Sequence, residues 1–131
     1  YAAPVSALSI NENVVWISIA PGANGRAVVT LEPASSGVPV VNSVQQRGGG
    51  GASVNVVRRP GVGMEVRGWI GSRSPSRRYQ MVIDDPAPFT TGALYEALRR
   101  HGVQVDGIAR LAAGAPCTVP ARDAGHRRDG A

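Results

Sequence analysis

The stretch VVWISIAPGANGRAVVTLE, residues 14–32, decides the fold class of this chain. Residues 14–20 are apolar on both faces, which is typical of a strand that is covered on both sides. Residues 26–32 alternate in polarity, and one face of this stretch carries Ala27, Val29 and Leu31. The intervening PGANG contains a Pro-Gly and an Asn-Gly pair, both strong turn formers. The segment therefore predicts two antiparallel β-strands.

The same two-residue period recurs outward from this segment. It predicts further strands at residues 4–11, 39–44, 53–58, 64–70 and 78–83, and a short strand at 103–105. Seventeen glycines and ten prolines supply turns between these short elements, and the strands follow one another at hairpin spacing. The fold class we expect is mainly β: an antiparallel sheet of short strands with a single helix near the C-terminal end.

That helix is expected at residues 91–101. Its apolar side is predicted to carry Leu94, Ala97, Leu98 and His101. Thr90 or Thr91 is a candidate N-terminal cap, and Gly102 can end the helix in the left-handed conformation. Residues 111–131 lack periodicity and are expected to form an irregular polar tail. The expected division is thus a β-rich region over residues 1–110 and a tail over 111–131.

The absence of lysine excludes several kinds of catalytic and binding chemistry. All fourteen basic residues are arginine, and the formal net charge is +5. Without lysine, the chain cannot form a Schiff base, a P-loop phosphate site or a Ser–Lys catalytic pair. Complete replacement of lysine by arginine, together with abundant Ala, Gly and Pro, is the signature of a compositional bias. We therefore consider a nucleic-acid partner unlikely on composition alone.

Three motifs that imitate binding sites have structural explanations. The run Gly48–Gly51 precedes a predicted strand and has no lysine, so a flexible hairpin connection explains it better than a phosphate loop. The arginines of the SRSPSRR segment, at 73, 77 and 78, fit a solvated loop between strands. Asp84 and Asp85 are neighbours on an extended segment and point to opposite sides, so they do not form an acid/base pair.

A thiol–imidazole pair is the remaining catalytic candidate. Cys117 could in principle act with His101 or His126, but it lies in an aperiodic segment between two prolines. Two histidines and one cysteine show no metal-site spacing. The residues therefore predict no catalytic, cofactor-binding or metal-binding site. The single cysteine allows no internal disulfide, and the chain shows neither a signal peptide nor a long apolar span.

The N-terminal stretch YAAPVSALSINEN, residues 1–13, resembles a segment of the class C low-molecular-mass penicillin-binding proteins. These are serine D-alanyl-D-alanine carboxypeptidase/endopeptidases. Later features follow in the family's order over about residues 1–110, and each is individually weak. They are the Pro-Gly pair at 21–22, the hairpin at 58–70, VIDDP at 82–86, ALYEAL at 93–98 and HGVQVDG at 101–107.

The resemblance implies an internal accessory position rather than a catalytic one. In that family, β-rich domains interrupt the catalytic domain after its Ser-x-x-Lys motif, and Ser-x-Asn and Lys-Thr-Gly follow them. No catalytic residue carries over to this chain, and Ser43, Ser53 and Ser72 are not expected to act as nucleophiles. The implied partners are the remainder of the peptidase catalytic domain and peptidoglycan. The implied location is extracytoplasmic, in the periplasm or cell wall.

Two alternatives remain open on the sequence. One is a free-standing basic β module that binds nucleic acid or another anionic polymer, which salt-dependent binding would reveal. The other is a small independent hydrolase that uses Cys117 or a serine. Thiol-blocking or serine-directed probes would detect that second activity.

Overall fold

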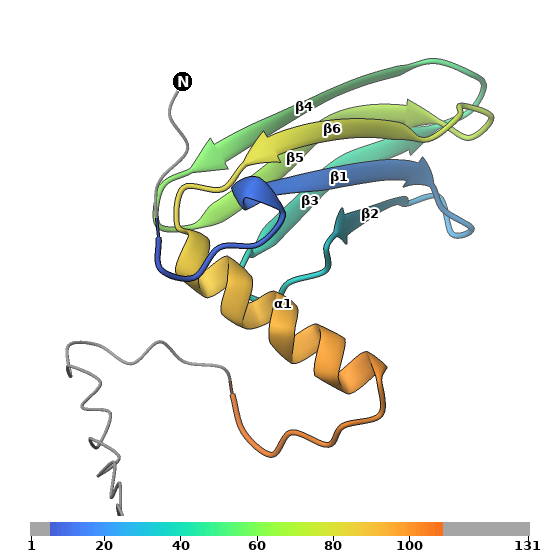
Figure 1. Ribbon diagram of the computed structural model, residues 1–131. Coiled ribbons are helices and arrows are strands. Elements are labelled where there is room, and N and C mark those ends of the chain that lie inside the picture. Colours follow the sequence, from blue (N-terminus) through green and yellow to red (C-terminus); the bar gives the residue numbers. More distant parts are fainter. Residues whose placement is uncertain (1–5, 109–131) are drawn as a thin grey trace, which may run out of the picture.

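The computed structural model describes residues 6–108, which form a mainly β structure with one α-helix (Figure 1). Six strands, β1 to β6, are arranged in two three-stranded sheets within this range. The helix α1, Pro86–Arg100, follows the last strand. The predicted fold class is therefore confirmed. The predicted tail at 111–131, with Cys117 and His126, lies outside the described residues.

The first sheet contains the predicted hairpin. Strand β1, Val14–Pro21, is central and pairs antiparallel with β2, Ala27–Glu32, and with β6, Arg77–Val82. The register joins Trp16 to Glu32 across β1 and β2, and Ile17 to Tyr79 across β1 and β6. The resulting strand order is β2-β1-β6.

The second sheet departs from the expected antiparallel pattern. Its central strand β5, Gly63–Gly71, pairs antiparallel with β4, Ala52–Arg59, and parallel with β3, Val40–Arg47. Strands β3 and β4 are adjacent in sequence but lie on opposite sides of β5, so the connection between them is not a hairpin. A two-residue period places side chains on faces but does not specify which strand is the neighbour, and this is why the parallel pair was missed.

The hydrophobic core lies between the two sheets. The inward side chains of the two central strands are fully buried, including Val15, Ile17, Ile19, Val66 and Ile70. Strand β1 alternates between buried and half-buried residues rather than being buried on both faces. The outward Trp16 is partly covered by Arg78, whose guanidinium lies 4.8 Å from the ring centroid. Such a contact shields an apolar ring while its charged partner stays in water.

Two predicted strands are not present. Residues 6–10 of the expected strand at 4–11 are irregular, and Asn11–Asn13 form a short 3₁₀ turn with positive φ angles. Asparagine tolerates this backbone region well, and the buried Asn13 accepts a hydrogen bond from Ser9 at 2.8 Å. Residues 103–105 are also irregular. Alternation over three residues is too short a signal to define a strand.

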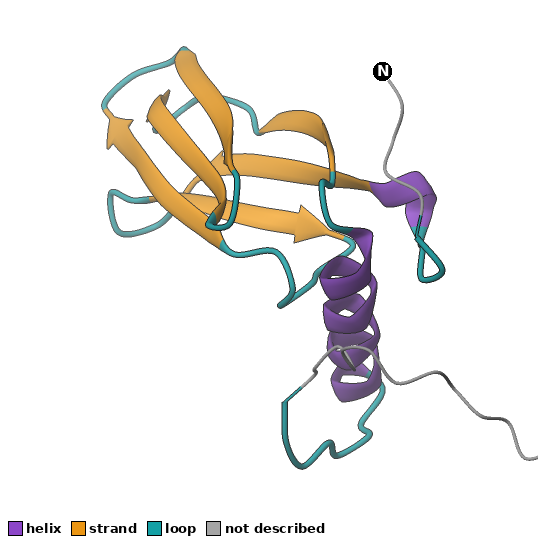
Figure 2. Ribbon diagram, turned by 90° about the vertical axis from the view of Figure 1, so that its left-hand side faces the viewer, coloured by secondary structure: helices purple, strands orange, loops and turns teal. Residues whose placement is uncertain are grey.

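Helix α1 begins earlier than predicted. It starts at Pro86, where the fixed φ of proline suits the first helical turn, and neither Thr90 nor Thr91 caps it. Thr91 instead donates a hydrogen bond to the carbonyl of Ala87 within the helix. The predicted end at Gly102 is confirmed, with φ of 79°. Figure 2 shows α1 extending away from the strands.

Candidate functional site: a docking surface on α1

We call the two sheets formed by β1 to β6 the β module. The first half of α1 is fixed to this module by the connection between β2 and β3. Phe89 is fully buried and packs into the core. The hydroxyl of Ser35 donates a hydrogen bond to the carbonyl of Phe89 at 2.7 Å, and the Gly37 amide donates to that hydroxyl at 3.2 Å. These contacts join segments about fifty residues apart and set the direction in which the helix leaves the module.

Two glycines permit this close approach. A Cβ on Gly37 would lie 1.8 Å from the carbonyl oxygen of Pro88, and a Cβ on Gly92 would lie 2.2 Å from the amide nitrogen of Gly37. Both distances are far inside van der Waals contact, so the connection and the helix touch backbone to backbone. Any side chain here would force the two segments apart.

The helix face that packs on the module is not the predicted one. The buried residues of α1 are Pro86, Phe89, Gly92 and Ala93. Leu94, expected to point inward, is 60% exposed. Ala97 and His101 are also exposed, and Leu98 is half-buried. The prediction followed leucine spacing and overlooked Phe89, the chain's only phenylalanine and the largest fully buried side chain.

α1 consequently has two apolar sides. At about 100° per residue, Leu94 lies roughly 140° around the helix from Phe89. We use the term α1 outer face for Ala87, Leu94, Ala97 and Leu98, which the same spacing places together. A helix of a soluble protein that is apolar on more than one side is normally covered on each of them. The α1 outer face is thus a candidate docking surface.

More exposed apolar surface follows the helix. Val103 is 47% exposed and Ile108 is 70% exposed. Ile108 lines a cavity of about 350 Å³ with Ser36, Gly37, Pro88, Thr91, Gly92 and Tyr95. Two backbone hydrogen bonds close the end of the helix. The Gly102 amide donates to the Arg99 carbonyl, and the Val103 amide donates to the Leu98 carbonyl. This capping pattern turns the chain back beside the helix.

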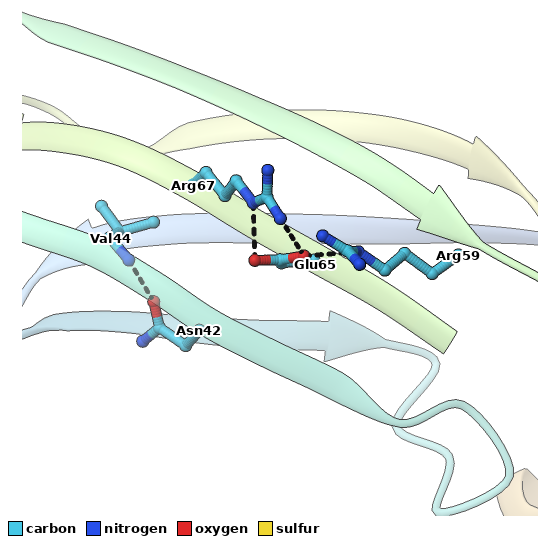
Figure 3. A network of polar contacts seen from close by, with 5 residues as sticks. All are labelled: Asn42, Val44, Arg59, Glu65 and Arg67. Atoms are coloured by element: carbon cyan, nitrogen blue, oxygen red, sulfur yellow. Dashed lines mark hydrogen bonds and ion pairs between the residues drawn. The ribbon is translucent and has the colours of Figure 1, made fainter. Parts of the chain in front are cut away.

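Four of the eight arginines at positions 14–82 form ion pairs with carboxylates. Arg59 and Arg67 both contact Glu65, at 2.7 and 2.5 Å (Figure 3), and Arg78 contacts Glu32 at 2.6 Å. Arg58 is paired with Asp84. In the same view Asn42 accepts a hydrogen bond from the Val44 amide at 3.1 Å. At these four arginines the positive charge is therefore interrupted by acids.

Glu65 is held ionised by this arrangement. The hydrogen bond from Arg67 is the main cause that keeps the pKa of Glu65 below its ordinary value of 4.5, and the charge of Arg59 adds to it. The same contact raises the pKa of Arg67. A charged, bidentate pair of this kind orders surface side chains. It is not poised for proton transfer near neutral pH.

Backbone hydrogen bonds hold the glycine run at residues 48–51 against the turn that follows β5. Three backbone amides, those of Gly71, Ser72 and Arg73, donate to carbonyls of the segment from Arg47 to Gly51. A Cβ on Gly71 would lie 2.4 Å from the Gly49 carbonyl oxygen. The glycine run is thus packed against the turn after β5. It connects β3 to β4, so the hairpin expectation for it is wrong.

The other candidates give no catalytic arrangement within residues 6–108. Asp84 is engaged with Arg58, and His101 is exposed at the end of α1. The described part of the chain contains no group of three or more His, Cys, Asp or Glu residues placed to hold a metal ion. No helix in that part is long and apolar enough to cross a membrane. Cys117 and its predicted surroundings lie outside the described range.

Comparison with known proteins identifies the family. The family model described as the D-Ala-D-Ala carboxypeptidase 3 (S13) family matches residues 1–117. The chain belongs to this family. The resemblance noted at residues 1–13 and in the ordered features up to residue 107 is therefore confirmed. Comparison with curated proteins gives no match.

Two solved structures of a penicillin-binding protein are similar to this chain at low sequence identity. Penicillin-binding protein 4 from Haemophilus influenzae, in complex with a novel β-lactam, matches with 12% identity and a TM-score of 0.48. The match covers 82% of this chain and 25% of that one. A second structure of that protein matches with 12% identity and a TM-score of 0.47, over 80% of this chain and 24% of the other. The chain thus spans about a quarter of that protein.

Proposed function

We propose that this chain is a non-catalytic accessory segment of a serine-type D-Ala-D-Ala carboxypeptidase. It supports the catalytic part of the enzyme, and α1 is the element through which it docks there. The family match supplies the enzyme class. The segment's own role rests on two features of its residues.

The observation that carries the proposal is the α1 outer face. Leu94 is 60% exposed although the opposite side of the same helix is anchored in the core. Burying a leucine fully is worth about 1.5–3 kcal/mol, so an uncovered leucine with apolar neighbours favours a covering partner. The family resemblance implies that the helix leads from the β-rich insertion back toward the catalytic domain. The catalytic part of the same polypeptide is therefore the covering partner that we propose.

The absence of lysine supplies the second argument. A Ser-x-x-Lys nucleophile and a Lys-Thr-Gly motif require lysine, and the chain has none. The acyl-serine chemistry of the complete enzyme must then reside in other residues of the polypeptide. There a serine would attack the D-Ala-D-Ala bond of a peptidoglycan peptide, and water would release the acyl group, outside the cytoplasmic membrane.

Release of D-alanine from a D-Ala-D-Ala peptide by the complete polypeptide tests this role. Ser43, Ser53 and Ser72 are exposed residues of the module, and we expect Ser→Ala variants at all three to retain the wild-type rate. A matched variant at the serine of a Ser-x-x-Lys motif elsewhere in the polypeptide should lose activity. Loss of activity at any of the three module serines, with folding intact, would refute the non-catalytic role.

A further inference from the structure

Three connections between strands meet at the end of the β module that is remote from the start of α1 (Figure 1). They are residues 22–26 between β1 and β2, 48–51 between β3 and β4, and 72–76 between β5 and β6. An isolated bridge between Arg26 and Gln45 joins the first connection to the second sheet. Both sheets therefore contribute to this end of the module.

Backbone hydrogen bonds fix the second and third connections to each other. The Ser72 amide donates to the Arg47 carbonyl at 2.8 Å, and the Arg73 amide donates to the Gly49 carbonyl at 2.9 Å. Because these bonds use main-chain atoms, they leave the guanidinium groups of both arginines available for other contacts. A Cβ on Gly48 would meet no atom within 4 Å. The glycine run thus leaves open space between Arg47 and the rest of its connection.

Four exposed arginines lie at this end of the module. They are Arg26 just before β2, Arg47 at the end of β3, Arg73 in the connection after β5, and Arg77 at the start of β6. The register places Arg77 opposite Ile19, near the end of β1. We call these four arginines the arginine end.

The acids of the module lie toward its other end. Between residues 13 and 83 the only acids are Glu32, the last residue of β2, and Glu65, near the start of β5. Asp84 follows the end of β6. These three carboxylates hold the four ion pairs of the described residues. The carboxylates and the arginine end therefore lie toward opposite ends of the strands, and the module is electrically polarised along them.

Arg47 is ordered by an aromatic ring. Its guanidinium lies 5.1 Å from the ring centroid of Trp69 on β5. A contact of this kind engages the face of the guanidinium and leaves the N–H groups at its edge free to donate. Ordering a long side chain in advance reduces the entropy that is lost when a ligand binds. The planar N–H groups of arginine match the two oxygens of a carboxylate.

We propose that the arginine end binds peptide carboxylates of peptidoglycan and so tethers the enzyme to the polymer on which it acts. This inference rests on the proposed function, because every D-Ala-D-Ala peptide ends in a carboxylate and the polymer carries many of them. α1 begins at the opposite end of the module (Figure 1). The arginine end can therefore contact the polymer while α1 contacts the catalytic part. Several weak contacts on one polymer reinforce one another, because each raises the effective concentration for the next.

Cosedimentation of the complete polypeptide with purified peptidoglycan tests the tether. The protein is first acylated with a β-lactam, so that binding does not depend on turnover. The double variant Arg47→Gln, Arg73→Gln should bind about tenfold more weakly, since each exposed contact of opposite charges contributes a factor of about three. The matched control is Arg59→Gln with Arg78→Gln. It removes the same charge from side chains that are 49% and 51% exposed and already paired with acids.

The control should change binding by less than about twofold. Equal losses in the two double variants would show a dependence on net charge alone and would overturn the proposal. Arg26→Gln with Arg77→Gln is a second test of the same surface at independent positions, and we expect a similar loss. Binding at the wild-type level by both arginine-end variants would also overturn the tether. Circular dichroism checks that each variant is folded.

Chemical modification of the polymer identifies the bound group. Peptidoglycan whose carboxylates have been converted to amides should bind the wild-type protein about as weakly as untreated polymer binds the double variant. Raising the salt concentration from about 50 to about 500 mM should weaken binding to the untreated polymer. Unchanged binding to the amidated polymer would overturn the assigned chemistry. Stronger binding to vesicles of anionic phospholipid than to peptidoglycan would assign the surface to a membrane and overturn the proposal.

Release of D-alanine from a soluble D-Ala-D-Ala peptide by the wild-type protein tests the proposed function separately. Wild-type activity without arginine-dependent binding to peptidoglycan would refute the tether alone. Absence of both D-alanine release and a β-lactam adduct would refute the proposed function itself, on which the tether rests.

Discussion

Replacing Leu94 with alanine measures how completely the α1 outer face is covered in the intact protein. Leu94 is 60% exposed in this chain. If the catalytic part docks on α1, this leucine becomes a buried interface residue. If α1 faces water, the substitution removes no buried contact, and alanine is the better helix former.

The expected magnitude follows from that exposed fraction. Complete burial of a leucine side chain contributes about 1.5–3 kcal/mol, so covering the exposed three fifths contributes about 1–2 kcal/mol. A cavity left at the interface would increase this cost. We therefore expect Leu94→Ala to lower the free energy of unfolding of the complete protein by about 1–2 kcal/mol or more.

Urea unfolding of the complete polypeptide, followed by circular dichroism, gives the measurement. Val28→Ala is the matched control, because Val28 is 49% exposed on β2, away from α1. A surface substitution of this kind should change the free energy of unfolding by less than about 0.5 kcal/mol. If Leu94→Ala costs no more than Val28→Ala, the α1 outer face is not an interface and the docking argument is wrong.

Two further predictions concern the module itself. The pKa of Glu65 lies below 4.5 in the folded state, so its contribution to stability is complete above pH 4.5 and is lost as the pH falls through the folded pKa. Glu65→Gln should remove that part of the acid dependence of the free energy of unfolding below pH 4.5, and an unchanged pH profile would contradict it. Gly37→Ala, whose Cβ would lie 1.8 Å from the Pro88 oxygen, should destabilise by about 1–3 kcal/mol or more in thermal unfolding. Gly48→Ala, where nothing lies within 4 Å, is its control and should be nearly neutral; equal effects would refute the close backbone contact.

Strand positions were more predictable than strand partners. The alternation around Val29, Val54 and Val66 correctly located strands, because a pleated strand must place successive side chains on opposite faces. The parallel pairing of β3 with β5 was not foreseeable from that period. It depends on how the glycine-rich connection crosses the end of β5, and this is decided by tertiary packing.

The helix shows a second limit of prediction from the sequence. Its existence and its end at Gly102 followed from local signals, but its buried side did not. Leu94 and Leu98 looked like core residues by spacing, whereas the contact with the module is made by Phe89 and Gly92. Glycine at a buried helix position is a signal of close backbone approach that could have pointed to this side.

The docking surface on α1 could be predicted only in part, because the burial of its residues depends on tertiary packing. Excluding lysine-dependent chemistry needed the composition alone. Recognising a docking surface required knowing which apolar residues remain uncovered after folding, and that depends on the position of α1 relative to β2 and β3. Contacts between distant segments, such as that of Ser35 in the β2–β3 connection with Phe89 in α1, carry no local sequence signature.

The most direct test of the central claim is to locate the acylated serine. The complete polypeptide should be treated with a labelled β-lactam, digested, and the modified peptide identified by mass spectrometry. We predict a single acyl-serine outside the 131 residues described by this sequence, in a Ser-x-x-Lys motif. A stoichiometric β-lactam adduct on a serine within these residues would contradict the assignment of this chain as a non-catalytic segment.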